Sequence, residues 1–124
     1  MAKGLHDDVL DGPFDVLIAH GNELVCCETE PTTYTQAHTT YKLADTALAG
    51  GDYTEAADTP SGRKVTIAAK NGVTVDTAGT ANWVCINDTV NSKLLVKTTC
   101  NAQVLTLPGT VDFPAWAIHN PQAI

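Results

Sequence analysis

The sequence predicts a mainly β protein, an antiparallel β-sandwich or a jelly-roll-like barrel with a short helical segment at its amino end. From Leu24 onward, runs of alternating polar and apolar residues are separated by turn residues. They recur at the spacing of about 8–12 residues that is typical of sandwiches and barrels. Eighteen threonines favour the same class, because threonine suits pleated, half-exposed surfaces. Residues 1–21 lack the alternation and resemble short acidic helices.

The length of 124 residues predicts a single domain, and 44% hydrophobic residues suffice for a sizeable core. We divide it into a helical segment over residues 1–21 and a β body over residues 22–124, with a long loop over residues 31–62. Charged residues make up only 17% of the chain, below the roughly 25% of ordinary soluble domains. Such a neutral surface is common in proteins that lie against others, and also in β proteins generally.

The charge of the chain is negative and unevenly placed. The net charge is −7, which argues against a nucleic-acid partner, because phosphates require a basic face. Residues 1–60 hold eleven acidic and two basic residues, whereas residues 61–124 hold three acidic and five basic ones. This asymmetry favours attraction to a basic patch on a partner or on a second copy. The alternative is that the two halves neutralise each other within one fold.

Targeting and membrane signals are not expected in this sequence. Lys3 is not followed by the apolar run of a signal peptide, and no stretch approaches the length of about 18 apolar residues that a membrane span needs. We therefore expect no membrane partner, and a chain that is made and kept in the cytoplasm or in something assembled there.

Two short helices are predicted in the amino segment, over Leu5–Asp11 and Phe14–His20. Gly12 separates them, Pro13 suits the first position of the second helix, and Gly21 follows its end as the C′ residue. One bent helix fits the same residues. The second helix has an apolar stripe at helical spacing, formed by Phe14, Leu17 and Ile18.

The first strand is predicted over Asn22–Glu28, and Pro31 follows its end. Pro31–Ala37 is interpreted as a surface turn, with at most one helical turn. Thr40–Ala49 is typical of a strand or an extended arm, which the Gly50-Gly51 pair ends.

A hairpin is predicted around Asn71-Gly72, after a strand over Arg63–Lys70. A three-residue loop places Ala69 opposite Val73 and keeps the apolar face whole. The expected connection is a type I turn with a bulge at Gly72.

Further strands of a meander are predicted over Ala81–Asn87, Lys93–Cys100, Gln103–Leu107 and Thr110–His119. In the first of these, Trp83 and Cys85 share one face, and Val84 and Ile86 share the other. Pro114 interrupts the last run, and since proline removes a ladder donor, that strand is expected at an edge or with a bulge.

The four cysteines do not predict a metal or redox site. Cys26, Cys27, Cys85 and Cys100 contain no Cys-x-x-Cys pair and no histidine at zinc-ligand spacing. Cys26 and Cys27 are adjacent in a strand, so they face opposite ways, and only one of them joins the core if one face is solvated. We expect small buried hydrophobes and no cofactor or metal ligand.

No catalytic residue is predicted. His6, Asp7, Asp8 and Asp11 cluster near the amino end, and such a cluster fits a divalent-ion site, an acid–base pair or a solvated helix face. The chain has no Gly-x-Ser-x-Gly sequence and no glycine-rich phosphate loop. We expect a protein that is not an enzyme.

Aromatic residues are the candidates for an interaction surface. Trp83 and Trp116 are expected in the core, and a sugar-stacking face is the alternative. The predicted interface anchors are Tyr34, Tyr41, Tyr53 and Trp116.

Several ordered runs of residues resemble small virion proteins of tailed bacteriophages. They span most of the chain, and none of them carries chemistry. The runs are Gly4–Gly12, Glu30–Tyr34, Ala44-Asp45, Ser61–Val65, Thr98–Cys100 and Val111–Trp116.

This resemblance implies a structural component of a phage particle, and within that class a capsid cement or decoration protein. Such a protein binds the outer surface of the major capsid protein shell and stabilises it. The implied partners are the major capsid protein and further copies of the chain, as a homodimer or homotrimer. The implied location is the capsid surface of a virion assembled in the host cytoplasm. The alternative is a tail or head-fibre component with a carbohydrate- or receptor-binding role.

Overall fold

The protein is mainly β and antiparallel, with 56% strand and little helix, as predicted. A computed structural model describes residues 12–57 and 62–120. The helix predicted over Leu5–Asp11 lies outside the described residues. The helical elements are α2 (Gly12–His20), η1 (Gln36–Thr40) and η2 (Gly50–Asp52). The strands are β1 (Glu23–Cys27), β2 (Lys42–Ala47), β3 (Tyr53–Ala57), β4 (Arg63–Ile67), β5 (Lys70–Thr74), β6 (Gly79–Asp88), β7 (Lys93–Leu105), β8 (Thr110–Phe113) and β9 (Trp116–Asn120).

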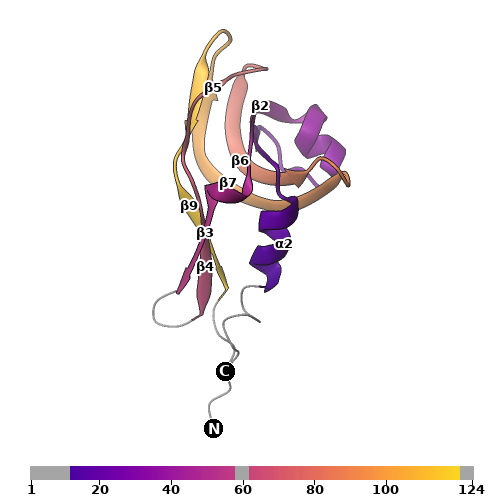
Figure 1. Ribbon diagram of the computed structural model, residues 1–124. Helices are drawn as coiled ribbons and strands as arrows, with labels where there is room; N and C mark the ends of the chain where they lie inside the picture. The colour runs from indigo at the N-terminus through magenta and orange to yellow at the C-terminus, as the bar shows by residue number, and fades with distance from the viewer. Residues whose placement is uncertain (1–11, 58–61, 121–124) are drawn as a thin grey trace.

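The described strands form three sheets, with the orders β2-β1-β6-β7, β3-β4-β9 and β5-β8. A single bridge between Ala44 and Val75 joins β2 to the end of β5. Figure 1 shows β3, β4 and β9 extending below the other strands, with α2 beside them. In these strand orders, β7 is an edge strand of the four-stranded sheet, and β8 and β9 are edge strands of the other two sheets.

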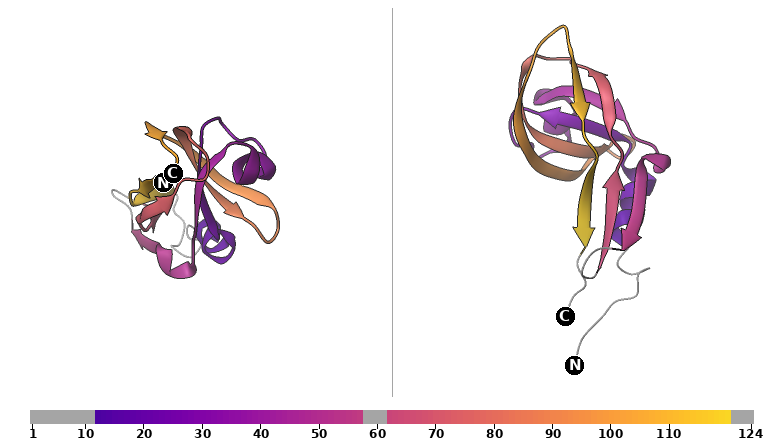
Figure 2. Two further views of the ribbon diagram at one scale, coloured as in Figure 1. Left: turned by 90° about the horizontal axis from the view of Figure 1, so that it is seen from above. Right: turned by 90° about the vertical axis from the view of Figure 1, so that its left-hand side faces the viewer.

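Two segments of chain pass from one sheet to another. Strand β4 pairs with β9, and after Ala68-Ala69 the chain continues as β5, which pairs with β8. Strand β8 continues as β9 after Pro114-Ala115, as the right-hand view of Figure 2 shows. The predicted run over Thr110–His119 is therefore two edge strands with the proline between them, because proline cannot donate to a ladder.

The hairpin predicted around Asn71-Gly72 does not form. Residues 70–74 pair with β8 rather than with the preceding strand, so Ala69 does not lie opposite Val73. A bulge is nevertheless present: the register shifts between Lys70 and Val73, and Gly72 has a φ of +67°. The Gly72 N–H donates to Asp112 Oδ1 at 2.8 Å. A long-range partner strand thus overrides the local turn signal.

The strands predicted over Lys93–Cys100 and Gln103–Leu107 are one continuous strand, β7. Its pairing with β6 is irregular in two places. Ile86 lies opposite Val96 and Asn87 opposite Leu94, so Leu95 is an extra residue. This bulge allows Leu95 and Val96 to pack on the same core.

Strand β1 is buried on both faces, and its two cysteines face opposite ways, as predicted. Cys26 belongs to the main core, whereas Cys27 packs with Val25, Ala37 and Cys85 in a second cluster. Both cysteines are buried because the helical turn η1 covers the second face of β1 with Ala37. The expectation that only one cysteine joins the core required one face of the strand to be solvated, and neither face is.

The long loop expected over residues 31–62 is largely structured. It contains η1, β2, η2 and β3, and β3 pairs along its length with β4. Strand β3 was not predicted, because its sequence Tyr-Thr-Glu-Ala-Ala has little apolar alternation. Pairing with β4 supplies the stabilisation that the local sequence lacks.

Helix α2 begins one residue before the predicted Pro13 start and buries Phe14 and Leu17 of the predicted stripe. Gly21 follows it and has no left-handed φ, so its conformation is not the reason for a glycine here. A Cβ at this position would lie 2.6 Å from the Tyr53 hydroxyl and 2.8 Å from the Leu17 carbonyl oxygen. The glycine is required by close packing.

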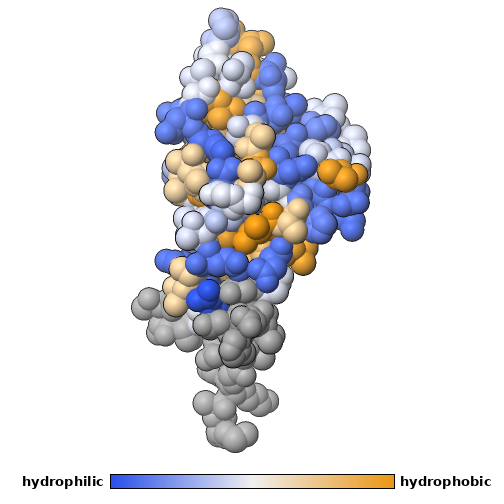
Figure 3. Space-filling view, in the orientation of Figure 1, coloured by the Kyte–Doolittle hydropathy of each residue, from blue (hydrophilic) through white to orange (hydrophobic). Residues whose placement is uncertain are grey.

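The surface in the view of Figure 3 is mostly hydrophilic, with an apolar patch at the level of α2. Within the ranges that the structure describes, no helix has the length and apolar character to cross a membrane.

Candidate interaction groove

A mainly apolar groove lies between β7 and the segment that joins β8 to β9. It consists of two adjoining pockets of about 250 and 240 Å³. The first pocket is lined by Val84, Thr98, Thr99, Cys100, Phe113, Pro114 and Trp116. The second shares four of these residues and extends along β7 to Gln103 and along β8 to Val111. The two pockets therefore form one continuous hollow.

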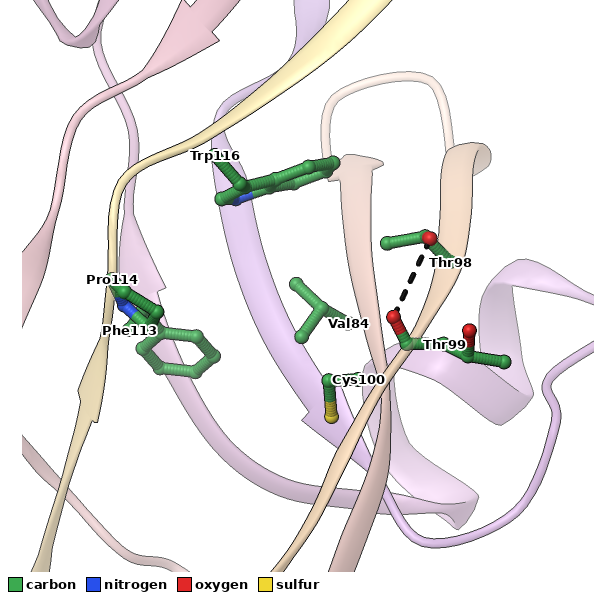
Figure 4. A pocket seen from close by; sticks show the side chains of 7 residues that line it. All are labelled: Val84, Thr98, Thr99, Cys100, Phe113, Pro114 and Trp116. Atoms are coloured by element: carbon green, nitrogen blue, oxygen red, sulfur yellow. Dashed lines mark hydrogen bonds between the residues drawn. The ribbon is translucent and has the colours of Figure 1, made fainter.

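Figure 4 shows how the side chains surround the first pocket. The rings of Trp116 and Phe113 lie on one side, Thr98 and Cys100 on the other, and Val84 between them. The groove exists because three sheet ends meet here without pairing: β7 ends one sheet, β8 a second and β9 a third. Pro114 ends β8 and separates it from β9 along this wall.

The outer half of β7 is uncharged and open to solvent. Thr98–Leu105 contains no ionisable side chain other than the Cys100 thiol, and each residue from Thr99 to Val104 is exposed. The Val104 side chain is 70% exposed, and Leu107 beyond it is 57% exposed. Natural sheet edges are usually short, charged or covered, and this one is none of these.

The groove offers contact rather than acid–base chemistry. The Cys100 Sγ donates to the Ala81 carbonyl at 3.8 Å, and partial burial raises the pKa of the Cys100 thiol. A thiol with a raised pKa is a poor nucleophile. Asp112 stands at the rim, where it accepts the Gly72 N–H.

Trp116 carries an unused donor in this wall. Its ring packs against the main core, yet its buried Nε1 has no hydrogen-bond acceptor among the described residues. Buried donors without partners are uncommon and require an explanation in each case.

A cluster of polar side chains joins β1 to η1 and to β6. Glu23 Oε1 interacts with His38 Nδ1 at 2.8 Å and accepts from Asn87 Nδ2 at 2.9 Å. The Tyr34 ring stacks on His38 with centroids 5.0 Å apart and an interplanar angle of 12°. These contacts fix η1 over the second hydrophobic cluster.

No metal site is assembled in the part of the chain that the structure describes, since no group of three His, Cys, Asp or Glu residues is suitably placed there. The cluster predicted from His6, Asp7, Asp8 and Asp11 lies outside that part. Asp88, the last residue of β6, holds the turn that follows: Asn91 Nδ2 donates to it at 2.8 Å, and this hydrogen bond lowers the pKa of the Asp88 carboxyl.

The four predicted anchors lie in different places. Trp116 lines the groove, Tyr34 stacks on His38, and Tyr41 packs against the second hydrophobic cluster. Tyr53 is only 7% exposed, and its hydroxyl donates to the Gly21 carbonyl. Because Tyr53 is buried within the protein, it is not part of the interface proposed below.

The groove itself was not predicted, because it forms where the consecutive strands β7, β8 and β9 belong to different sheets and do not pair with one another. The uncharged run over Thr98–Leu105 and the break at Pro114 were the available signals. Comparison with known proteins adds nothing further: no protein-family model matches the chain, and no curated protein or solved structure is significantly similar to it.

Proposed function

We propose that this chain is a non-enzymatic structural protein of a bacteriophage virion, most specifically a capsid cement or decoration protein. The observation that carries a contact function is the apolar groove beside the unpaired, uncharged edge of β7. The assignment to a virion rests on the resemblance of the ordered sequence runs. The groove supports the virion assignment because a structural subunit acts through contact surfaces, such as an apolar groove beside an unpaired strand edge.

The proposed partners are the major capsid protein and further copies of this chain, at the outer surface of the shell. Many weak contacts suffice there, because many copies act together on one closed particle. No cofactor, membrane or nucleic acid takes part in this proposal. The net charge of −7 supports the last point.

For the fold we propose the sandwich or jelly-roll-like class. The support is that β4 continues into β5 and β8 into β9, so that two bent strands face the four-stranded sheet. The Ala44–Val75 bridge joins the two layers on one side. On the other side, β7 and β8–β9 stay apart at the groove.

Binding to capsids tests the function. The purified chain is mixed at about micromolar concentration with capsids of the same phage that lack it, and both are sedimented together. Saturable co-sedimentation, with increased resistance of the capsids to heat, is the expected result. Capsids that sediment without the chain contradict the proposal.

One observation favours the alternative of a tail or head-fibre component that binds carbohydrate. The stacked Tyr34 and His38 rings form a partly exposed planar surface of the kind on which sugars stack. A glycan array distinguishes the two. Binding that Tyr34→Ala abolishes supports the alternative, and an array without signal removes it.

A further inference from the structure

We propose that the groove is a strand-addition site: it binds an extended peptide segment of a partner protein along the free edge of β7. This inference rests on the groove alone and holds whether or not the chain belongs to a virion. The segment has apolar side chains at two alternate positions and a basic residue two positions before them.

The first argument is hydrogen bonding. Strand β7 is 13 residues long and pairs only with β6, so its outer backbone N–H and C=O groups face no other strand of the described sheets. The partner that fits a row of such groups is another extended backbone. The register with β6 also shifts between Ala81 and Trp83, and bulges of this kind are frequent next to functional sites.

The second argument is the spacing of the pockets. The first pocket contacts β7 at Thr98, Thr99 and Cys100, and the second contacts it further along, at Cys100, Asn101 and Gln103. Alternate side chains of an added strand are about 6.6 Å apart and point the same way. Two apolar side chains at i and i+2 therefore fit the two pockets in turn. Each pocket exceeds the volume of about 150 Å³ that accommodates benzene in an engineered cavity.

The third argument is charge. The walls beside Trp116 carry no ionised group, which excludes a charged anchor from the first pocket. Asp112 and Gln103 both line the second pocket, which lies nearer the carboxyl end of β7 than the first. Antiparallel pairing is the slightly more stable arrangement, and it brings the amino end of the segment to Asp112. A lysine or arginine two residues before the first apolar residue complements this carboxylate.

In the test, the full chain is titrated with a synthetic peptide, acetyl-Thr-Lys-Thr-Val-Thr-Leu-Thr-amide. Two-dimensional NMR measures the shifts of the backbone amide signals of the chain. We expect saturable shifts in residues 96–105 and 113–116, with a dissociation constant in the micromolar to millimolar range. Replacing the peptide's valine and leucine by aspartate should weaken binding at least tenfold. The absence of saturable shifts up to about 2 mM peptide, or shifts that map to β3 instead, would overturn the proposal.

A second pair of peptides separates strand addition from simple filling of the pockets. One peptide is N-methylated on the amides of one backbone edge and the other on the opposite edge. One of them should lose binding at least tenfold, because its donors face β7, and the other should keep it. Equal binding by both would show apolar contact without strand pairing and would contradict the inference.

A variant of the chain supplies the matched control. Cys100→Arg places a charge at the junction of the two pockets and should reduce binding at least tenfold. Thr54→Arg places the same charge on the exposed edge strand β3 and should leave binding unchanged. The amide spectrum of each variant shows that it is folded. Equal affinity of the two variants would refute the site.

Discussion

The Tyr53 hydroxyl donates a 2.8 Å hydrogen bond to the carbonyl oxygen of Gly21 and thereby joins the end of α2 to the three-stranded sheet. The two residues are 32 positions apart, and both are buried. A glycine allows the tyrosine oxygen to approach, because a Cβ would lie 2.6 Å from it. This contact holds the carboxyl end of α2, whose Phe14 and Leu17 belong to the core, against β3.

Replacing Gly21 by alanine should destabilise the protein. The added methyl group would meet the Tyr53 hydroxyl, the Leu17 carbonyl and Ile86, and two of these three neighbours are backbone or packed core atoms. We expect a loss of about 1–3 kcal/mol in the free energy of unfolding, measured by urea denaturation.

Gly51→Ala is the matched control, because a Cβ there has nothing within 4 Å. Its effect should stay within about 0.5 kcal/mol. Equal losses in the two variants would show that the close approach at Gly21 has no energetic weight.

Stability at high pH should depend on Tyr53. Burial raises the pKa of Tyr53 to about 12, whereas an unfolded tyrosine ionises near pH 10. The stabilisation from keeping the hydroxyl neutral is therefore complete below about pH 10 and is lost as the pH rises toward 12. Burial raises the pKa of Cys26 to about 12 as well, and it adds to the same alkaline loss.

Tyr53→Phe should lower stability at pH 7 by about 1 kcal/mol, since it removes a buried hydrogen bond. It should also lose less stability than the parent between pH 9 and pH 11.5. The measurement is urea unfolding at several pH values, with Tyr41→Phe as the control. A parent and Tyr53→Phe variant with parallel pH profiles would contradict the account.

Acid sensitivity should involve Asp52. Lys70 Nζ donates to Asp52 Oδ1 at 2.9 Å and the Ala49 N–H donates to Oδ2 at 2.8 Å, and together they lower the pKa of the Asp52 carboxyl. The stability that this group contributes is present above its ordinary pKa of about 3.9 and is lost as the pH falls through the lowered value.

Asp52→Asn should therefore cost about 0.5–1 kcal/mol at pH 7, a value that allows for solvent screening of the pair. The difference from the parent should shrink below about pH 4. Urea unfolding at pH 7 and pH 3 measures it, and a difference that persists unchanged at pH 3 would exclude the ionised pair as its cause.

Thiol reactivity should single out Cys100. Cys26, Cys27 and Cys85 are buried, and only Cys100 is an exposed thiol. We expect one of the four thiols to react with a disulfide reagent in the native protein and all four after unfolding. Reaction should be slow at pH 7, because the pKa of the Cys100 thiol is raised. Rapid reaction of a second thiol would contradict the closed packing of η1 over Cys27.

Elements with their own periodicity were predictable from the sequence. Helix α2 follows from Pro13 and the apolar stripe of Phe14 and Leu17, and the two faces of β6 follow from alternation. Trp83 and Cys85 indeed belong to one hydrophobic cluster, and Val84 and Ile86 to the other.

Features that depend on distant partners were not predictable. The Asn71-Gly72 signal is a local turn preference, and pairing with β8 overrides it. Strand β3 exists through its ladder with β4. The groove requires β7 and Pro114 to lie near each other, and no local pattern specifies this. The resemblance to virion proteins includes residues of β7 and the run that contains Pro114, but it does not indicate that they lie close together.

The central claim is that this chain acts by contact within a virion. Cryo-electron microscopy of the particle that contains it tests this most directly. The account predicts density for the chain at joints between capsomers, in many symmetric copies on the outer surface. Density confined to a few copies at the tail or fibre bases would contradict the cement role, and particles without any density for the chain would contradict the virion assignment itself.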